Sequence, residues 1–205
     1  MKKLLPVFLF FLVFWGYAQE SLTYQKPSKE ILNLVDAPLA PTVLITDNGK
    51  YMVMLYRDTY KTIEELSEDE LRLAGLRINP KTNIGSRTNY YNNIKIKATT
   101  ASQETQINGL PENPRLANFS WSPDQTKIAV TNTTKTGVEV WVLDLEESSV
   151  KKITEASVNA NMGDVINWFK DGNSILVKML PSARKALINV GEAVPNGPTI
   201  STRIC

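Results

Sequence analysis

The sequence predicts an all-β fold, a partial β-propeller of about two and a half four-stranded blades. Three observations predict it. A phrase of strand, polar turn and strand occurs three times, around residues 47–49, 123–125 and 170–172. Further strand-like segments follow the first two copies, so that each of these units contains four short strands. The tryptophans of the second and third copies, Trp121 and Trp168, are 47 residues apart, and that period is typical of a propeller blade.

The N-terminus has the pattern of a secretory signal peptide. Lys2 and Lys3 precede an uncharged apolar run over residues 4–17, and Gly16 and Ala18 place small residues at a cleavage site. A membrane anchor is the alternative, but the run is shorter than the ~20 residues that a spanning helix needs. We therefore expect residues 1–18 to be removed and the mature protein to be exported.

Charge and composition exclude several classes of function. The chain has 23 Lys and Arg against 21 Asp and Glu, and removal of Lys2 and Lys3 makes the two counts equal. A neutral chain without a basic block argues against nucleic acid as a partner, and against a membrane after signal cleavage. Cys205 is the only cysteine, so no disulfide can form within one chain. There is no histidine, which excludes a conventional Ser-Asp-His triad.

A lead-in segment over residues 19–40 is expected to contain a short helix that packs on the main body. Ser28 is a suitable N-cap, and Pro38 and Pro41 end the helix. The helix has one apolar face, made of Ile31, Leu32, Leu34 and Val35.

The three hairpins align without gaps. Turn residues Asn48, Asp124 and Asp171 correspond to one another, and Asp and Asn favour such turns because their side chains bond nearby backbone N–H groups. Gly49 and Gly172 occupy the next position of the first and third turns, where the second turn has Gln125. Gln125 is therefore the exception of the set.

These hairpins divide the chain beyond residue 40 into an incomplete propeller, 41–205. The first blade is expected over 41–110, with an insert at 59–89, and its third and fourth strands over 92–100 and 104–110. Because Thr62 and Ser67 with Glu70 are helix-start signals, the insert should be helical or irregular. The second blade covers 111–157, with strands at 137–145 and 149–154, and a partial blade covers 158–205. An immunoglobulin-like sandwich is the alternative, but it would not repeat a phrase at this spacing.

Two longer phrases carry a family resemblance. "ELRLAGLRINP" (residues 70–80) and "GLPENPRLANFSW" (residues 109–121) occur in this order. They resemble the N-terminal propeller of secreted bacterial serine peptidases of the prolyl oligopeptidase family, in its glutamyl-endopeptidase-like branch. The resemblance covers about residues 24–199, and it implies a bacterial protein that is periplasmic or secreted.

The resemblance also implies what the chain lacks. In that family the propeller precedes an α/β-hydrolase domain with a Ser-Asp-His triad and limits access to peptides. This chain has neither a G-x-S-x-G nucleophile motif nor a histidine, so we expect it to be inactive by itself. The expected partners are the missing hydrolase domain, the remaining blades and, in the full-length parent, peptide substrates. We expect that the hydrolase domain and the remaining blades are missing because of an early stop or frameshift near Arg203, or because of an incomplete gene model. The alternative is a stand-alone periplasmic binding or scaffold module, completed by oligomerisation.

No catalytic, cofactor-binding or metal-binding residue is expected. Asp124 and Asp171 are interpreted as turn formers, and Trp121, Trp141 and Trp168 as residues that pack between blades. The acidic run at residues 64–70 is interpreted as a solvated face, with a cation-recognising rim as the alternative. Nothing in the sequence near Cys205 would activate its thiol.

Overall fold

The computed structural model describes residues 25–185, so the predicted signal peptide and Cys205 lie outside the described residues. The chain divides into two units, residues 1–37 and 38–205, which are described separately. The predicted lead-in helix is confirmed as α2 (Lys29–Val35), and Ser28 is its N-cap. No residue of α2 is buried, and Leu34 is 79% exposed. The packing of this helix on the main body therefore stays a prediction.

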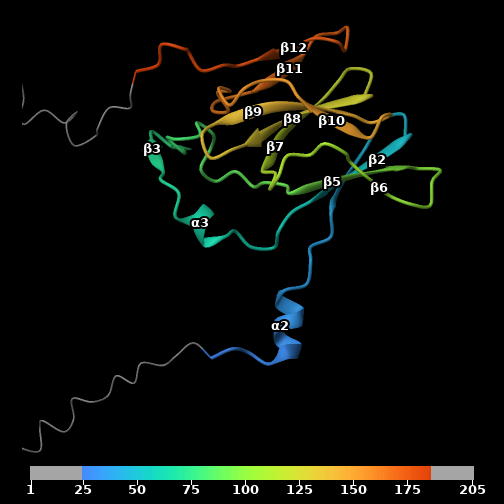
Figure 1. Ribbon diagram of the computed structural model, residues 1–205, viewed down its shortest axis with the longest axis vertical. Coiled ribbons are helices and arrows are strands. Elements are labelled where there is room, and N and C mark those ends of the chain that lie inside the picture. Colours follow the sequence, from blue (N-terminus) through green and yellow to red (C-terminus); the bar gives the residue numbers. More distant parts are fainter. Residues whose placement is uncertain (1–24, 186–205) are drawn as a thin grey trace, which may run out of the picture. The chain divides into compact units, whose positions relative to one another are not determined.

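The second unit is built of antiparallel β-sheets, which confirms the predicted all-β class (Figure 1). The first sheet has the strand order β1-β2-β5-β6. Its strands are β1 (Thr42–Ile45), β2 (Tyr51–Tyr56), β5 (Asn93–Ala98) and β6 (Thr105–Gln106). Neighbours in this sheet are also consecutive along the chain once the insert between β2 and β5 is set aside, as the repeat predicts.

The second sheet has the same arrangement, in the order β10-β9-β8-β7. Its strands are β7 (Leu116–Trp121), β8 (Lys127–Thr133), β9 (Val138–Asp144) and β10 (Ser149–Lys152). The third repeat forms a two-stranded sheet of β11 (Ile166–Trp168) and β12 (Ile175–Val177). All three predicted hairpins are therefore present.

The insert differs from its prediction in one part. Thr62 caps the short helix α3 (Ile63–Leu66) in a capping box with Glu65, as predicted for this start signal. Ser67, however, ends this helix instead of starting another. The residues that follow form a hairpin of β3 (Leu71–Leu73) and β4 (Leu76–Ile78). Ala74 and Gly75 between them both have positive φ (45° and 91°), as a tight two-residue hairpin turn requires.

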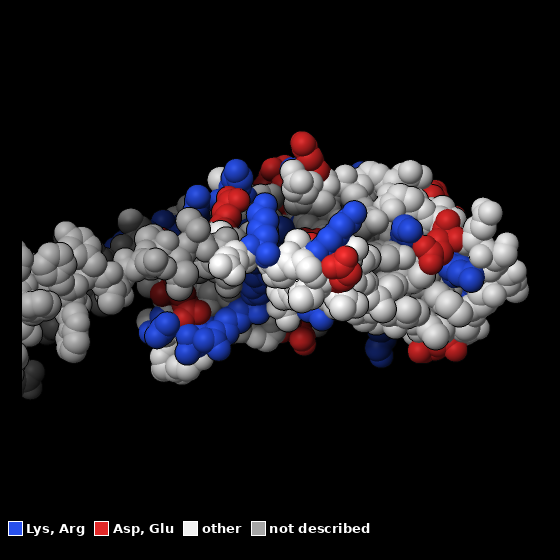
Figure 2. Space-filling view, turned by 90° about the horizontal axis from the view of Figure 1, so that it is seen from below, with Lys and Arg blue, Asp and Glu red and all other residues white. Residues whose placement is uncertain are grey.

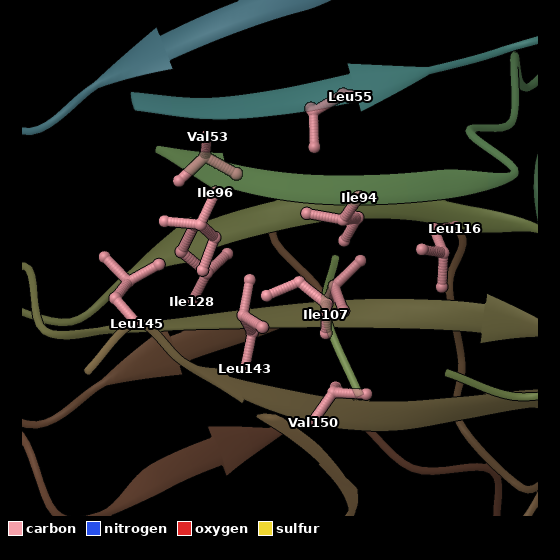
Figure 3. Close-up of a cluster of buried hydrophobic side chains, with 11 residues drawn as sticks. Val53, Leu55, Ile94, Ile96, Ile107, Leu116, Ile128, Leu143, Leu145 and Val150 are labelled. Carbon is pink, nitrogen blue, oxygen red and sulfur yellow. The ribbon is translucent and has the colours of Figure 1, made fainter. Parts of the chain in front are cut away.

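A first hydrophobic core lies between the first and second sheets (Figure 3). Apolar residues of β2 and β5 meet apolar residues of β7, β8 and β9, because period-2 alternation points one face of each sheet toward the other. The buried members are Val53, Leu55, Ile94, Ile96, Ile107, Leu116, Ile128, Val130, Leu143, Leu145 and Val150.

A second core covers the opposite face of the second sheet. Ala129 of β8 and Val138 and Val140 of β9 pack there against residues of the third repeat and of the insert. Those partners include Val158, Val165, Ile166 and Ile84. The second sheet is thus buried on both faces, between the first sheet on one side and the third repeat with part of the insert on the other.

Candidate functional site

The three hairpin turns have the same hydrogen-bond geometry. Each closes with one backbone bond across the turn, from Gly49, Gln125 and Gly172 to the carbonyl three residues earlier, at 2.8, 2.9 and 3.1 Å. In each, the preceding Asx oxygen accepts a bond from the N–H two residues later: from Lys50 to Asn48 (2.9 Å), Thr126 to Asp124 (3.2 Å) and Asn173 to Asp171 (3.0 Å). Asp124 and Asp171 thus have the predicted turn-forming role.

The carboxylate of Asp124 is also bonded by the Ser122 hydroxyl at 2.6 Å. That bond, with those from Thr126, lowers the pKa of Asp124 below its usual value. Among residues 25–185 there is no group of three or more acidic or cysteine side chains that could hold a metal ion.

Gln125 is the exception in sequence but not in conformation. Its φ is 56°, close to the 65° of Gly49 and the 66° of Gly172. The amide side chain of Gln125 bonds Asp47 in the neighbouring turn: its oxygen accepts from the Asp47 N–H at 2.5 Å, and its nitrogen donates to the carboxylate. A side chain at this position therefore links the turns of the first and second sheets, which glycine could not do.

The tryptophans pack between sheets. Trp121 and Trp141 lie against the first core, and Trp168 lies against the second. The indole N–H of Trp168 donates to the Ser120 carbonyl at 3.0 Å, which ties the third repeat to β7. Their predicted role in packing is the one observed.

The acidic run was only partly a solvated face. Glu68 accepts a bond from Arg115 at 2.9 Å and another from Asn79 at 2.7 Å, and Glu65 lies 3.8 Å from Arg115. The interpretation as a purely solvated face is therefore wrong for these carboxylates. Sequence could not show it, because Arg115 is 47 residues away from Glu68 along the chain.

Among the carboxylates of the acidic run, Glu70 is the one whose pKa is clearly lowered by its neighbours. It accepts a bond from the Ser86 hydroxyl at 2.5 Å and pairs with Arg72 and Arg77 at 2.8 and 2.7 Å. These bonds, the one from Ser86 foremost, lower its pKa from 4.5 to about 2. Glu70 thus holds the β3–β4 hairpin to the segment that follows.

Arg115 connects the insert to the second sheet. Its guanidinium lies over the Tyr90 ring, 4.3 Å from the centroid. Burial in turn raises the pKa of Tyr90. The backbone N–H of Arg115 donates to Asn132 of β8 at 3.0 Å. Arg115 thus joins three segments through its side chain and its backbone, which suits a structural role better than a catalytic one.

A cleft of about 410 Å³ lies between β7 and β11. Its lining consists of residues 118–120 and 163–167. Most of the side chains around it are polar, and they include Asn118, Ser120, Asp164 and Asn167. The sequence does not predict this cleft, because its two walls belong to different repeats.

One wall of the cleft is a bulge in β7. The register between β7 and β8 shifts between Ala117 and Ser120, so Asn118 and Phe119 together stand opposite one residue of β8, Val130. The Asn118 amide also donates to the Thr131 hydroxyl at 3.0 Å. Asn118 has a φ of 52°, and the ring of Phe119 packs edge-on against Tyr91 at 5.5 Å. Bulges of this kind re-aim the strand and interrupt its pairing. The cleft is the candidate functional site of the described residues.

Charges elsewhere do not form a patch of one sign on the face in Figure 2, where Lys and Arg lie interspersed with Asp and Glu. Across residues 25–185, no helix has the length and apolar character needed to cross a bilayer.

Two curated plant proteins are similar to the chain. Both are described as probable chloroplastic glutamyl endopeptidases, one from Oryza sativa subsp. japonica and one from Arabidopsis thaliana. Each is 28% identical to the chain over 192 residues, which are 87% and 85% of this chain but 20% and 19% of those proteins. No protein-family model matches the chain. The chain is thus similar, over most of its length, to about a fifth of two proteins named as glutamyl endopeptidases, which relates it to peptidases.

Proposed function

We propose that the chain is the N-terminal propeller portion of an exported serine peptidase related to the glutamyl endopeptidases. By itself it has no peptidase activity. The observation that carries this proposal is the similarity of 192 residues to one fifth of each plant relative. In a complete parent enzyme, the propeller would limit the access of peptides to an α/β-hydrolase domain.

The stacking of the sheets supports a propeller. Equivalent turns lie side by side: Gln125 of the second turn bonds Asp47 of the first, and Gly172 of the third lies against the Asp124 side chain of the second. Propeller blades are successive copies of one unit that pack face to face with equivalent strands aligned. The proposed blades are residues 41–110, 111–157 and 158–205.

The open face of the first sheet supports further blades. Val43 and Ile45 of β1 are 47% and 56% exposed, although their equivalents in the second sheet, Phe119 and Trp121, pack against the first core. In a closed ring every blade has a neighbour on both sides. The remaining blades and the hydrolase domain would be supplied by a longer parent protein, exported by way of the signal peptide at residues 1–18 to the periplasm or the medium of a bacterium.

A direct experiment tests the absence of activity. The chain, purified without residues 1–18, is incubated with fluorogenic peptides that contain glutamate and with a fluorophosphonate probe of reactive serines. We expect neither hydrolysis nor labelling, while a complete glutamyl endopeptidase, as the control, shows both. Hydrolysis by the chain that the probe inhibits would overturn the proposal.

A second experiment tests the parent enzyme. We expect the DNA downstream of the Cys205 codon, in the same or a shifted frame, to encode more repeats and a G-x-S-x-G segment. Its absence there would favour the second candidate, a stand-alone binding or scaffold module. The open apolar face of β1 favours that candidate too, since a second copy could cover it. Light scattering separates the two, because only the module forms a uniform oligomer.

A further inference from the structure

We propose that the cleft between β7 and β11 binds an extended peptide segment and that Asp164 receives a lysine or arginine side chain of that peptide. The inference deepens the proposed function and rests on it for the biological source of the peptide. The preference of the cleft for a peptide with a basic side chain, by contrast, is argued from the described residues alone.

The backbone of β7 forms one wall of the cleft. This strand is at the edge of the second sheet, and beyond Leu116, which bonds Tyr91, it runs along the cleft. In the bulge, Asn118 and Phe119 together face one residue of β8, Val130, and the Ser120 carbonyl accepts a bond from the Trp168 indole N–H. An edge strand is the surface on which extended peptides add as a further strand. The main chain of a peptide is therefore the ligand that this wall suits.

Three polar side chains of the cleft have no bonding partner among the described residues. Ser120, Asp164 and Asn167 line the cleft, and within residues 25–185 their side chains make no hydrogen bond or ion pair. The carboxylates of Asp144 and Asp171 are different, because each accepts bonds from two N–H groups of its own turn. That of Asp124 accepts bonds from one N–H group and two hydroxyls of its turn. Asp164 is thus an acid that no local turn uses.

The charge of the residues that line the cleft is negative. The lining has one carboxylate and neither lysine nor arginine, so an acidic side chain would meet only repulsion there. The nearby Lys178 is already engaged: its ammonium donates to the carbonyls of Asn161 and Met162. Those two bonds hold the loop that leads to Asp164. A basic side chain is therefore preferred over an acidic one.

The cleft is small. A volume of about 410 Å³ is at the lower end of the range of roughly 300–1,000 Å³ for ligand sites. It is sufficient for one long side chain and the adjoining main chain, but not for a folded partner.

The experiment uses the purified chain and capped, fluorescein-labelled heptapeptides of alternating valine and threonine. The central residue is lysine in one peptide and glutamate in the other, and a third peptide has the lysine with N-methyl groups on alternate amides. Fluorescence anisotropy measures the dissociation constants. We expect the lysine peptide to bind at least about tenfold more tightly than the glutamate peptide. The N-methylated peptide should not bind, because it cannot pair with an edge strand.

Two protein variants locate the site. Asp164→Asn should weaken binding of the lysine peptide about threefold to fivefold, the effect of one exposed ion pair, and reduce the preference over glutamate. Asp69→Asn is the matched control, because Asp69 is an exposed carboxylate of the insert, and it should change nothing. Circular dichroism checks that both variants keep the parent fold.

Equal affinity for the two charged peptides, unchanged binding of the N-methylated peptide, or no peptide binding at all would each overturn the inference. None of these results bears on the proposed function, which depends on the hydrolysis assay and the downstream DNA. Conversely, a chain that binds the lysine peptide through Asp164 retains this site even if no parent peptidase exists.

Discussion

The first and second sheets have the same strand connectivity and begin with the same hairpin phrase, yet they are buried to different degrees. In the second sheet, six of the seven residues of β8 are buried. In the first sheet, three of the six residues of the equivalent strand β2 are buried, and β1 is mostly exposed. The second sheet has a neighbour on each face, whereas the described neighbour of the first sheet, within its unit, covers one face.

This difference shows that burial in the repeat depends on the neighbouring copy and not on the unit itself. Each sheet is too thin to bury its own apolar residues, so stability comes from the interfaces between sheets. Substitutions should therefore have large effects between sheets and small effects on the open face.

The largest effect is expected at the interface between the two sheets. Ile128 of β8 is completely buried in the first core, so Ile128→Ala should lower the free energy of unfolding by about 2–5 kcal/mol. Ile45→Ala is the control on the open face, where the side chain is 56% exposed, and it should cost less than about 1 kcal/mol. Urea denaturation measures both; equal losses would contradict the comparison.

A smaller effect is expected where the insert meets the second sheet. Arg115→Met leaves Glu65 and Glu68 without their cation and should destabilise the protein by about 1–3 kcal/mol. Lys50→Met breaks the ion pair with Glu146, in which both side chains are more than half exposed, and should cost less than about 1 kcal/mol. Urea midpoints compare them, and an equal shift in both variants would show that the insert is not held through Arg115.

Substitutions at the equivalent turn positions 49 and 125 should differ in their effect on the free energy of unfolding by about 1 kcal/mol. Gly49→Ala places a side chain at a φ of 65° in open space, so it should cost about 1–2 kcal/mol through the backbone alone. Gln125→Gly relieves the same backbone cost but removes the bonds to Asp47, so its net effect should be within about 1 kcal/mol of zero. Thermal unfolding of the two variants measures this, and a large loss for Gln125→Gly would mean that the link between turns outweighs the strain.

The smallest effect concerns pH. The pKa of Glu70 is lowered from 4.5 to about 2, so its contribution to stability is present above pH 4.5 and is lost as the pH falls toward 2. In Glu70→Gln the urea midpoint should therefore fall less between pH 5 and about pH 2.5 than in the parent. Glu155→Gln, which alters an exposed carboxylate, should keep the parent's pH profile. Identical profiles for all three proteins would show that Glu70 does not stabilise the hairpin.

The sequence by itself determined the all-β class, the three hairpins, the four-stranded order of two sheets and the helix at Ser28. The alternation of apolar and polar residues, the Asx turns and the repeated phrase each depend on residues that are close together in the sequence. The structures that they indicate can therefore be predicted without knowledge of distant contacts. It also determined the resemblance to peptidases, through phrases such as residues 109–121.

The tertiary structure alone decided the remaining features. The β3–β4 hairpin was missed because a start signal at Ser67 and Glu70 competes with a turn at Ala74 and Gly75, and the bonds of Glu70 to Ser86 and Arg77 favour the hairpin. Gln125 looked like an exception until its bond to Asp47 across two sheets was visible. The cleft at Asp164 could not be predicted, since its walls come from separate repeats and only the packing of one sheet on the next brings them together.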